Sequence, residues 1–469
     1  MSSRHRERRR PAAPLLLVAL LAVLLVALLA AACGNAKSDK SSGTSTTTGS
    51  VATKVDAADL RVHHSVDETG VTDGEIRVSV IAAITNPLGI DFGAFGNGIK
   101  AYLDMVNSGG GLYGRQLKVA AVHDDQLSNN TNAVEAALAQ DNAFSVFVAT
   151  SLFTGASVLA AQKVPTFGWN VNTEWTGHDT FFPNWPAYCF SCAAPFAPYL
   201  AQQTHARRIG IVAYSVPQAA DCANWNEVSL EKWPTGKIVF SDKSIPFGVA
   251  DVSAQVAQLR DRHVQLLLTC MDANGAFTFA KEMQKDGVNI PMLVPNSYDH
   301  AFMKANGKYF EGSYVSVQVT PLETRPQPAE MNKMLSWVAK TKQPVTELTM
   351  QGWIAANQFV TGVKLAGPDF NRAKVVAALN AQTHFTANGM VRPLDWTRDH
   401  ISAKDRPNDT VGLDCLVILK VHDNAFVSSF GAPADKPWPC WTVASEGRGS
   451  SAPVPLPAPT YSSFVPTSG

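Results

Sequence analysis

The chain has 469 residues, of which 46% are hydrophobic and 17% charged, a composition typical of a globular protein with room for two domains. Its 39 basic and 39 acidic residues give a formal net charge of zero. This balance removes any bulk electrostatic case for binding nucleic acid, and we expect no nucleic-acid partner.

The first 33 residues have the three parts of a bacterial secretion signal. A basic stretch at 4–10 precedes an unbroken apolar run at 15–32, and small residues lead into Cys33. A cysteine in this position resembles a lipobox, in which the thiol receives lipid and becomes the new N-terminus. We expect a lipoprotein signal peptide over 1–33 and attachment to the outer face of the cell membrane. The alternative is an uncleaved anchor, because the run is long enough to span a bilayer.

Two stretches of low hydrophobicity flank the part of the chain that is predicted to fold. Residues 34–70 begin with a run of Ser, Thr, Gly and Lys and are predicted to be a flexible tether. Residues 447–469 are rich in Pro and Ser and are predicted to be a disordered tail.

Between these stretches, strand-like runs alternate with helical patterns. The first series, starting with a strand, is 75–84, 96–106, 116–122, 130–140, 143–149, 154–161 and 164–168. The pattern then restarts with 209–213, 221–232, 237–241, 252–260, 264–269, 276–285 and 292–294. This order predicts an α/β protein with two parallel sheets, each covered by helices on both faces. Two such lobes in tandem form a cleft at the carboxyl ends of their strands.

The cysteines indicate a disulfide-bonded protein in an oxidising compartment. Removing Cys33 from the seven leaves an even number, namely Cys189, Cys192, Cys222, Cys270, Cys415 and Cys440. The last two flank a strand-like segment and are expected to pair. The other four allow three pairings, of which we favour Cys222 with Cys270 and Cys189 with Cys192. The CFSC stretch lacks a second CxxC and a nearby histidine pair, which argues against a redox motif or a zinc site.

Signatures of catalysis are poor. The sequence has no HExxH, no Walker loop, no GxSxG elbow and no GxGxxG after a strand. His123, Asp124 and Asp125 end a predicted strand, and we interpret them as a polar loop that caps the next helix. We therefore expect no enzyme activity, no catalytic residue, no cofactor and no metal.

Four stretches, taken in order along the chain, carry a resemblance to a known family. They are IRVSVIAAITNPLG, GIKAYLDMVNSGGGLYGRQLKV, the Asp124–Asp125 pair and GWIAANQFVTGVKLAGPDFNRAKVVAAL. Together they resemble type I periplasmic binding proteins, and most closely the branched-chain amino acid substrate-binding lipoproteins of ABC transporters. The resemblance spans about residues 71–441.

The resemblance implies two doubly wound lobes joined by a hinge of three crossovers. These crossovers are expected near Cys192, Val319 and Thr383. The lobes that follow from them are lobe 1, over 71–192 and 320–383, and lobe 2, over 193–319 and 384–446.

The resemblance also implies ligand contacts from the loops that follow the strands of lobe 1. A loop that enters a helix presents unpaired N–H groups and the positive end of the helix dipole, which suits a carboxylate. Thr154 matches the family's hydroxyl residue that holds this carboxylate, and Asn170 and Asn172 complete the grip. Phe92 matches an aromatic wall. The alternatives are an N-cap for Thr154, turn residues for the two asparagines and a packed loop aromatic for Phe92.

Lobe 2 is expected to contribute Gln218, Asp272 and Asn296 to the same site. The family usually has an acidic residue where Asn296 stands, and it pairs with the ammonium group of the ligand. An amide does not supply that charge, and a buried ammonium without a counter-charge is costly. Either Asp272 substitutes, or the ligand lacks an α-amino group. Asp272 is alternatively the cap of the following helix.

The resemblance implies a solute receptor that closes over a small ligand, an amino acid, an amide or a carboxylate, and delivers it to the permease subunits of an ABC importer. We expect a monomer that is held outside the cytoplasm by its N-terminal lipid. One alternative is a sensor that reports the ligand to a membrane signalling protein. Another is an envelope hydrolase that uses Asp272 or the Asp124–Asp125 pair.

Overall fold

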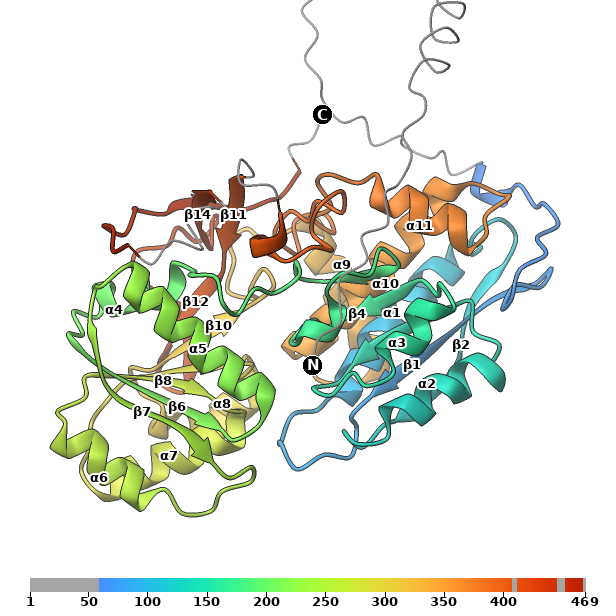
Figure 1. Cartoon of the computed structure of the whole chain (residues 1–469). Helices are drawn as coiled ribbons and strands as arrows, with labels where there is room; N and C mark the ends of the chain where they lie inside the picture. The colour runs from blue at the N-terminus through green and yellow to red at the C-terminus, as the bar shows by residue number, and fades with distance from the viewer. Residues whose placement is uncertain (1–58, 407–410, 445–451, 467–469) are drawn as a thin grey trace, which may run out of the picture. The chain divides into compact units, whose positions relative to one another are not determined.

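The computed structural model describes residues 59–406, 411–444 and 452–466 (Figure 1). The predicted signal peptide and the lipidation site Cys33 lie outside the described residues. Within these three ranges, no helix combines the length and the apolar character that a membrane span requires.

The first sheet has five parallel strands in the order β2-β1-β3-β4-β5. They are β1 (Glu75–Ala82), β2 (Gln116–Asp124), β3 (Ser145–Ala149), β4 (Thr166–Gly168) and β5 (Phe181–Pro183). All residues of β3 are buried, as expected for an inner strand of a parallel sheet that is covered on both faces.

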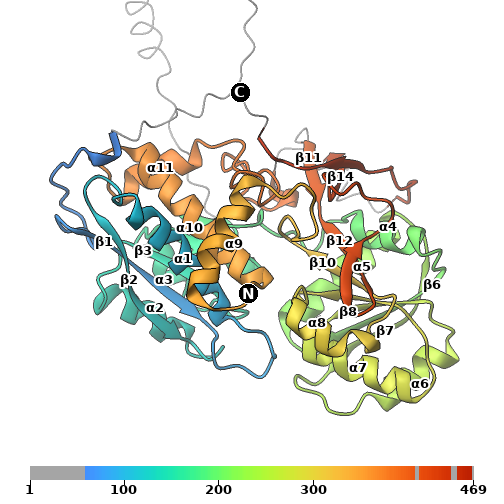
Figure 2. The same ribbon diagram turned by 180° about the vertical axis from the view of Figure 1, so that it is seen from behind.

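Helices from two distant parts of the chain cover this sheet. From the same part come α1 (Gly93–Ser108), α2 (Asn130–Ala139) and α3 (Ala156–Ala161). From a later part come α9 (Ala329–Thr341), α10 (Glu347–Ala366) and α11 (Arg372–Asn380). Helices α1, α9 and α10 lie together on one face, and α2 and α3 on the other (Figures 1 and 2).

The second sheet has seven strands in the order β13-β12-β10-β9-β8-β6-β7, of which β12 and β13 are antiparallel to their neighbours. The parallel strands are β6 (Arg208–Tyr214), β7 (Lys237–Ile245), β8 (Leu266–Cys270), β9 (Met292–Pro295) and β10 (Tyr314–Val317). The edge is completed by β12 (Val417–His422) and β13 (Ala425–Ser428). The helices of this half are α4 (Phe196–Gln203), α5 (Pro217–Lys232), α6 (Ser253–Asp261), α7 (Ala273–Lys285) and α8 (His300–Asn306).

These two helix-covered sheets confirm the predicted α/β class with parallel strands. The chain passes between the sheets after β5, after β10 and again after α11. The lobe boundaries near Cys192, Val319 and Thr383 stay a prediction.

A third, smaller sheet forms near the C-terminus from β11 (Val411–Cys415), β14 (Trp438–Ala444) and β15 (Thr460–Ser462). The disordered tail predicted over 447–469 therefore needs correction for residues 452–466. Strand β15 pairs with β14, and the ring of Phe464 lies 5.8 Å from that of Trp438. Aromatic residues inside the Pro/Ser-rich stretch dock on the protein, which the average composition of the tail does not reveal.

The last part of the tether predicted over 34–70, from residue 59 onward, packs on the protein and is not a free tether. Residues 59–61 form a 3-10 turn, and the carbonyl oxygen of His64 accepts a hydrogen bond of 2.7 Å from Arg115 Nη2. Arg115 is fully buried, so its guanidinium needs such acceptors. The carbonyl groups of the segment before β1 supply them.

Three disulfides join Cys189 to Cys192, Cys222 to Cys270 and Cys415 to Cys440. These are the pairs favoured from the sequence. The first lies in the connection between the two sheets, and the second joins α5 to β8.

Candidate functional site

A cavity of about 390 Å³ is lined by residues from both large sheets. The first half contributes the loops after β1, β3 and β4, with Ile90, Leu152 and Trp169 among the lining residues. The second half contributes the segments after β6, β7, β8, β9 and β10. The cavity therefore lies at the carboxyl ends of the parallel strands, where open α/β sheets bind their ligands.

Most of the cavity wall is apolar, and a cluster of aromatic rings dominates one side. This aromatic wall consists of Tyr188, Phe190, Phe196 and Trp225. The rings of Tyr188 and Phe190 stack with their centroids 5.0 Å apart, and Trp225 meets the Tyr188 ring edge-on at 5.9 Å. Trp169 and Trp185 add two further indole rings to the lining. Such rings offer a large, rigid contact area to an apolar ligand.

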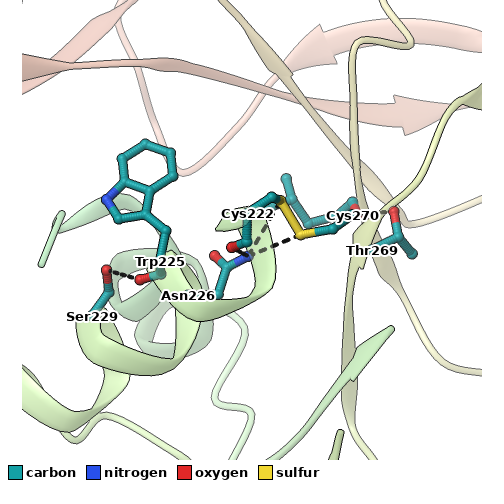
Figure 3. The surroundings of a disulfide bond; sticks show 7 residues. Cys222, Trp225, Asn226, Ser229, Thr269 and Cys270 are labelled. Atoms are coloured by element: carbon teal, nitrogen blue, oxygen red, sulfur yellow. Dashed lines mark hydrogen bonds between the residues drawn. A yellow bond between two sulfur atoms is a disulfide. The ribbon is translucent and has the colours of Figure 1, made fainter. Parts of the chain in front are cut away.

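Helix α5 brings Trp225 and Asn226 to the cavity, and a disulfide holds this helix against β8 (Figure 3). Both Cys222 and Cys270 line the cavity. Asn226 Nδ2 donates a 3.1 Å hydrogen bond to the carbonyl oxygen of Cys222 and lies 3.5 Å from the sulfur of Cys270. The Oδ1 atom of Asn226 is buried and accepts no hydrogen bond from any described residue.

Gln318, directly after β10, connects the cavity wall to a buried carboxyl group. Its side chain accepts a 3.2 Å hydrogen bond from Trp169 Nε1 and donates one of 2.6 Å to the hydroxyl of Tyr188. Its backbone N–H donates to Glu347 Oε1 at 2.8 Å. Burial raises the pKa of Glu347 to about 7. Gln318 thus holds two aromatic residues of the lining in place and depends on the first residue of α10.

The three residues predicted from lobe 2, Gln218, Asp272 and Asn296, all line the cavity. Asp272 is also the N-cap of α7, the alternative that the sequence left open. Its Oδ1 accepts hydrogen bonds of 2.7 and 3.0 Å from the backbone of Asn274 and Gly275, and its Oδ2 accepts one of 2.8 Å from the hydroxyl of Tyr214. Burial raises the pKa of the Asp272 carboxyl.

The residues predicted from lobe 1 do not line the cavity. Thr154 is exposed, and its hydroxyl lies 3.0 Å from that of Thr131. This cavity therefore lends no support to its expected contact with a ligand carboxylate, which stays a prediction. The helix it was to begin, α3, starts only at Ala156.

Phe92, Asn170 and Asn172 are buried behind the cavity wall rather than in it. The Phe92 ring packs against Trp169, which does line the cavity, with centroids 5.6 Å apart. The two asparagines donate to backbone carbonyl groups, Asn170 to Pro186 at 3.1 Å and Asn172 to Ser151 at 3.2 Å. Both amides therefore tie separate segments of the chain together, and their contact with a ligand stays a prediction.

The Asp124–Asp125 pair serves the local backbone. Asp125 is fully buried, accepts from Leu127 N at 2.9 Å and from Asn130 Nδ2 at 2.8 Å. Asp124 accepts from Thr85 N at 3.1 Å. Neither carboxylate lines the cavity, so this pair lends no support to a hydrolase at that site.

In the described parts of the chain, one group of side chains has the spacing of a metal site, Glu311, His422 and Asp423. All three are exposed, and none lines the cavity. Exposed acidic groups are common without an ion, and this group carries no functional assignment.

The family model for periplasmic binding proteins matches residues 75–407. The chain belongs to the periplasmic binding protein family. This result confirms the resemblance to type I periplasmic binding proteins, whose tandem α/β sheets the structure displays. No curated protein matches the sequence.

Solved structures of periplasmic binding proteins share this fold at low sequence identity. LivJ of Streptococcus pneumoniae, a branched-chain amino acid transporter substrate-binding protein in complex with isoleucine, is 14% identical, with a TM-score of 0.63 over 78% of this chain and 99% of that one. An ABC transporter solute-binding protein from R. palustris in complex with benzoate is 17% identical, with a TM-score of 0.64 over 80% and 99%. A fatty acid ABC transporter substrate-binding protein from Thermomonospora curvata is 17% identical, with a TM-score of 0.62 over 82% and 97%.

Most residues that line the cavity of this periplasmic binding protein were not predicted from its sequence. Trp169, Trp185, Tyr188 and Trp225 are among its aromatic lining, and Gln318 organises two of them. A usable signal existed for Trp169, which directly follows a predicted strand and precedes the predicted Asn170. Trp225 lies three residues after Cys222, on the same side of a predicted helix.

Proposed function

We propose that this protein is an extracytoplasmic, lipid-anchored solute-binding protein that holds a small ligand in the cavity and delivers it to an ABC importer. One observation carries the proposal: the cavity draws its lining from the carboxyl ends of strands in both sheets. A ligand held there contacts both halves of the protein at once, so ligand binding favours closure of one half on the other.

The chemistry of the lining supports binding rather than catalysis. Asp272 is the acidic residue of the cavity wall, and its oxygens cap α7 and accept from Tyr214. We propose no nucleophile or general base on this basis. The neighbouring structures bound to isoleucine and benzoate are consistent with a small-molecule ligand for this chain too.

The binding site is tested by filling the cavity from α5. Ala219 is buried and lines the cavity, so Ala219→Phe places a ring in the space that the ligand would occupy. A thermal-shift screen of amino acids, amides, short-chain acids, aromatic acids and ring alcohols selects a ligand, whose dissociation constant is then measured by calorimetry. We expect Ala219→Phe to weaken binding by about 100-fold or more, which corresponds to about 2.7 kcal/mol.

Ala220→Phe is the matched control, because the neighbouring Ala220 does not line the cavity. It should bind with nearly the affinity of the wild type, and thermal unfolding checks that both variants are folded. Equal affinity of the two variants, or a screen in which no compound stabilises the protein, contradicts the proposed site.

The lipid anchor is tested at Cys33. We expect Cys33→Ala to abolish labelling by radioactive palmitate, because no thiol remains to be acylated. Cys415→Ala combined with Cys440→Ala removes two other cysteines, which form a disulfide, and should leave the labelling intact. A wild-type protein that takes up no palmitate and stays in the membrane fraction would instead support the uncleaved anchor.

A further inference from the structure

The cavity has little to offer an anionic ligand. Asp272 is its one acidic residue, and no lysine, arginine or histidine from the described ranges lines it. A ligand carboxylate would leave water for an apolar space that offers no counter-ion. It would also share the cavity with a second carboxyl group, that of Asp272.

At two helix starts near the cavity, backbone donors do not replace the missing cation, because they are already in use. At α7, the N–H groups of Asn274 and Gly275 donate to Asp272. Before α3, Gly155 N donates to Asn130 Oδ1 at 2.9 Å, and Leu152 N lies 3.4 Å from Thr150 Oγ1. These N–H groups therefore bind side chains of the protein itself and are not free for a ligand carboxylate.

An ammonium group also lacks a suitable partner. The Asp272 carboxyl group already accepts three hydrogen bonds from the protein, two of them as the cap of α7, so its oxygens are engaged. Asn296, which also lines the cavity, is an amide and supplies no negative charge. A zwitterionic amino acid would thus lose the hydration of both charged groups without gaining a dedicated partner for either.

Two features of the cavity wall favour a ligand that has rings and a neutral hydrogen-bond donor over a charged one. The aromatic wall, together with Trp169 and Trp185, provides ring faces and edges for a hydrocarbon ring system. Asn226 is 3% exposed and lines the cavity, and its Oδ1 has no donor among the described residues. Once the Asn226 amide turns toward the cavity, a hydroxyl or N–H group of a ligand would supply the hydrogen bond that this buried oxygen lacks.

We infer that the ligand is an uncharged, ring-bearing molecule that donates a hydrogen bond to Asn226, rather than an amino acid or a carboxylate. This inference rests on the proposed ligand-binding function and specifies its substrate class. The rings occupy the aromatic side of the cavity, and the donor group faces α5.

The test compares three probes with the same ring system and different charge. They are 2-naphthylmethanol, 2-naphthoate and 2-naphthylmethylamine, which are neutral, anionic and cationic at pH 7.5. Quenching of the cavity tryptophans reports binding to the purified protein. We expect the alcohol to bind about 100-fold more tightly than either ion, because only the ions pay a desolvation penalty that the cavity does not offset. Equal or tighter binding of either ion, or of isoleucine, overturns the inference.

A second experiment tests the hydrogen bond to Asn226. Asn226→Leu nearly conserves side-chain volume and should weaken binding of 2-naphthylmethanol about 10-fold while leaving 2-methylnaphthalene unchanged. Asn224→Leu is the matched control on the same helix, because Asn224 is exposed and does not line the cavity. Equal losses for both probes in Asn226→Leu contradict the assigned role. If that variant does not fold, the charge series with the wild type still decides the inference.

The outcomes separate this inference from the proposed function. If 2-naphthoate binds most tightly and Ala219→Phe abolishes its binding, the site stands and the inference about charge is wrong. If no probe and no screening compound binds, the proposed function is wrong and the inference falls with it.

Discussion

Gly98→Ala is expected to destabilise the protein by about 3 kcal/mol or more, one of the largest effects of any single methyl group in this fold. Gly98 lies in α1 where that helix crosses α10. A Cβ atom at this position would meet the backbone carbonyl oxygen of Thr349, and one at Gly352 would reciprocally meet that of Phe95. The two helices approach each other backbone to backbone, so no flexible side chain can move aside to accommodate a methyl group.

Gly96→Ala is the control for this prediction. A Cβ atom at Gly96, two residues away on the same helix, has Val80 Cγ1 at 3.7 Å as its nearest neighbour, which is an ordinary contact. We expect this variant to be neutral or more stable by up to about 1 kcal/mol, because alanine favours helix over glycine. Urea unfolding followed by circular dichroism measures both. Similar stability of the two variants would show that α1 and α10 are not in such close contact.

Glu347→Gln is expected to make the protein more stable than the wild type at pH 8.5 by about 3 kcal/mol, and to change little at pH 5. Glu347 is 8% exposed, and within the described ranges no lysine, arginine or histidine forms an ion pair with it. Glutamine retains a side-chain oxygen that can accept from Gln318 N. The substitution therefore removes the ionisable group and conserves the contact.

The sign of this stability change follows from the direction in which the pKa of Glu347 shifts. Burial raises the pKa of Glu347 to about 7 in the folded protein, from an ordinary value of 4.5. The folded state then binds the proton more tightly than the unfolded chain. The Glu347 carboxyl group therefore makes its full contribution to the free energy of unfolding below pH 4.5, and this contribution is lost as the pH rises through about 7. Urea titrations of both proteins between pH 5 and pH 8.5 measure this loss. Glu135→Gln, at an exposed site of α2, should follow the wild type. If stability depends on pH in the same way in Glu347→Gln and in the wild type, the loss is not caused by ionisation of the buried Glu347 carboxyl group.

Hydrophobic periodicity was sufficient to predict most of the fold, because core strands and amphipathic helices carry their pattern locally. The apolar run around β3 and the helical stripe of α1 both appear where they are predicted. Helix α5 begins at Pro217 rather than at the predicted 221, since proline is well tolerated in the first turn of a helix. Strands as short as β5 and β15, with three residues each, carry no readable period.

The candidate site was harder to predict, because it depends on contacts between distant segments. The family resemblance assigned Thr154 to the ligand, but Asn130 binds the backbone of Gly155 and the Thr154 hydroxyl lies beside Thr131. That arrangement follows from the packing of α2 on α3, which no local pattern specifies. Asp272 was predictable to the extent that it directly follows a strand. Its engagement by Tyr214, 58 residues earlier, was not.

A crystal structure of the protein purified without denaturation from cells that produce it tests the central claim most directly. The account predicts density for a bound small molecule in the cavity, in contact with Trp169 from the first half and with Trp225 and Asn226 from the second. A bound ligand located elsewhere, with the cavity closed by its own side chains, would contradict it.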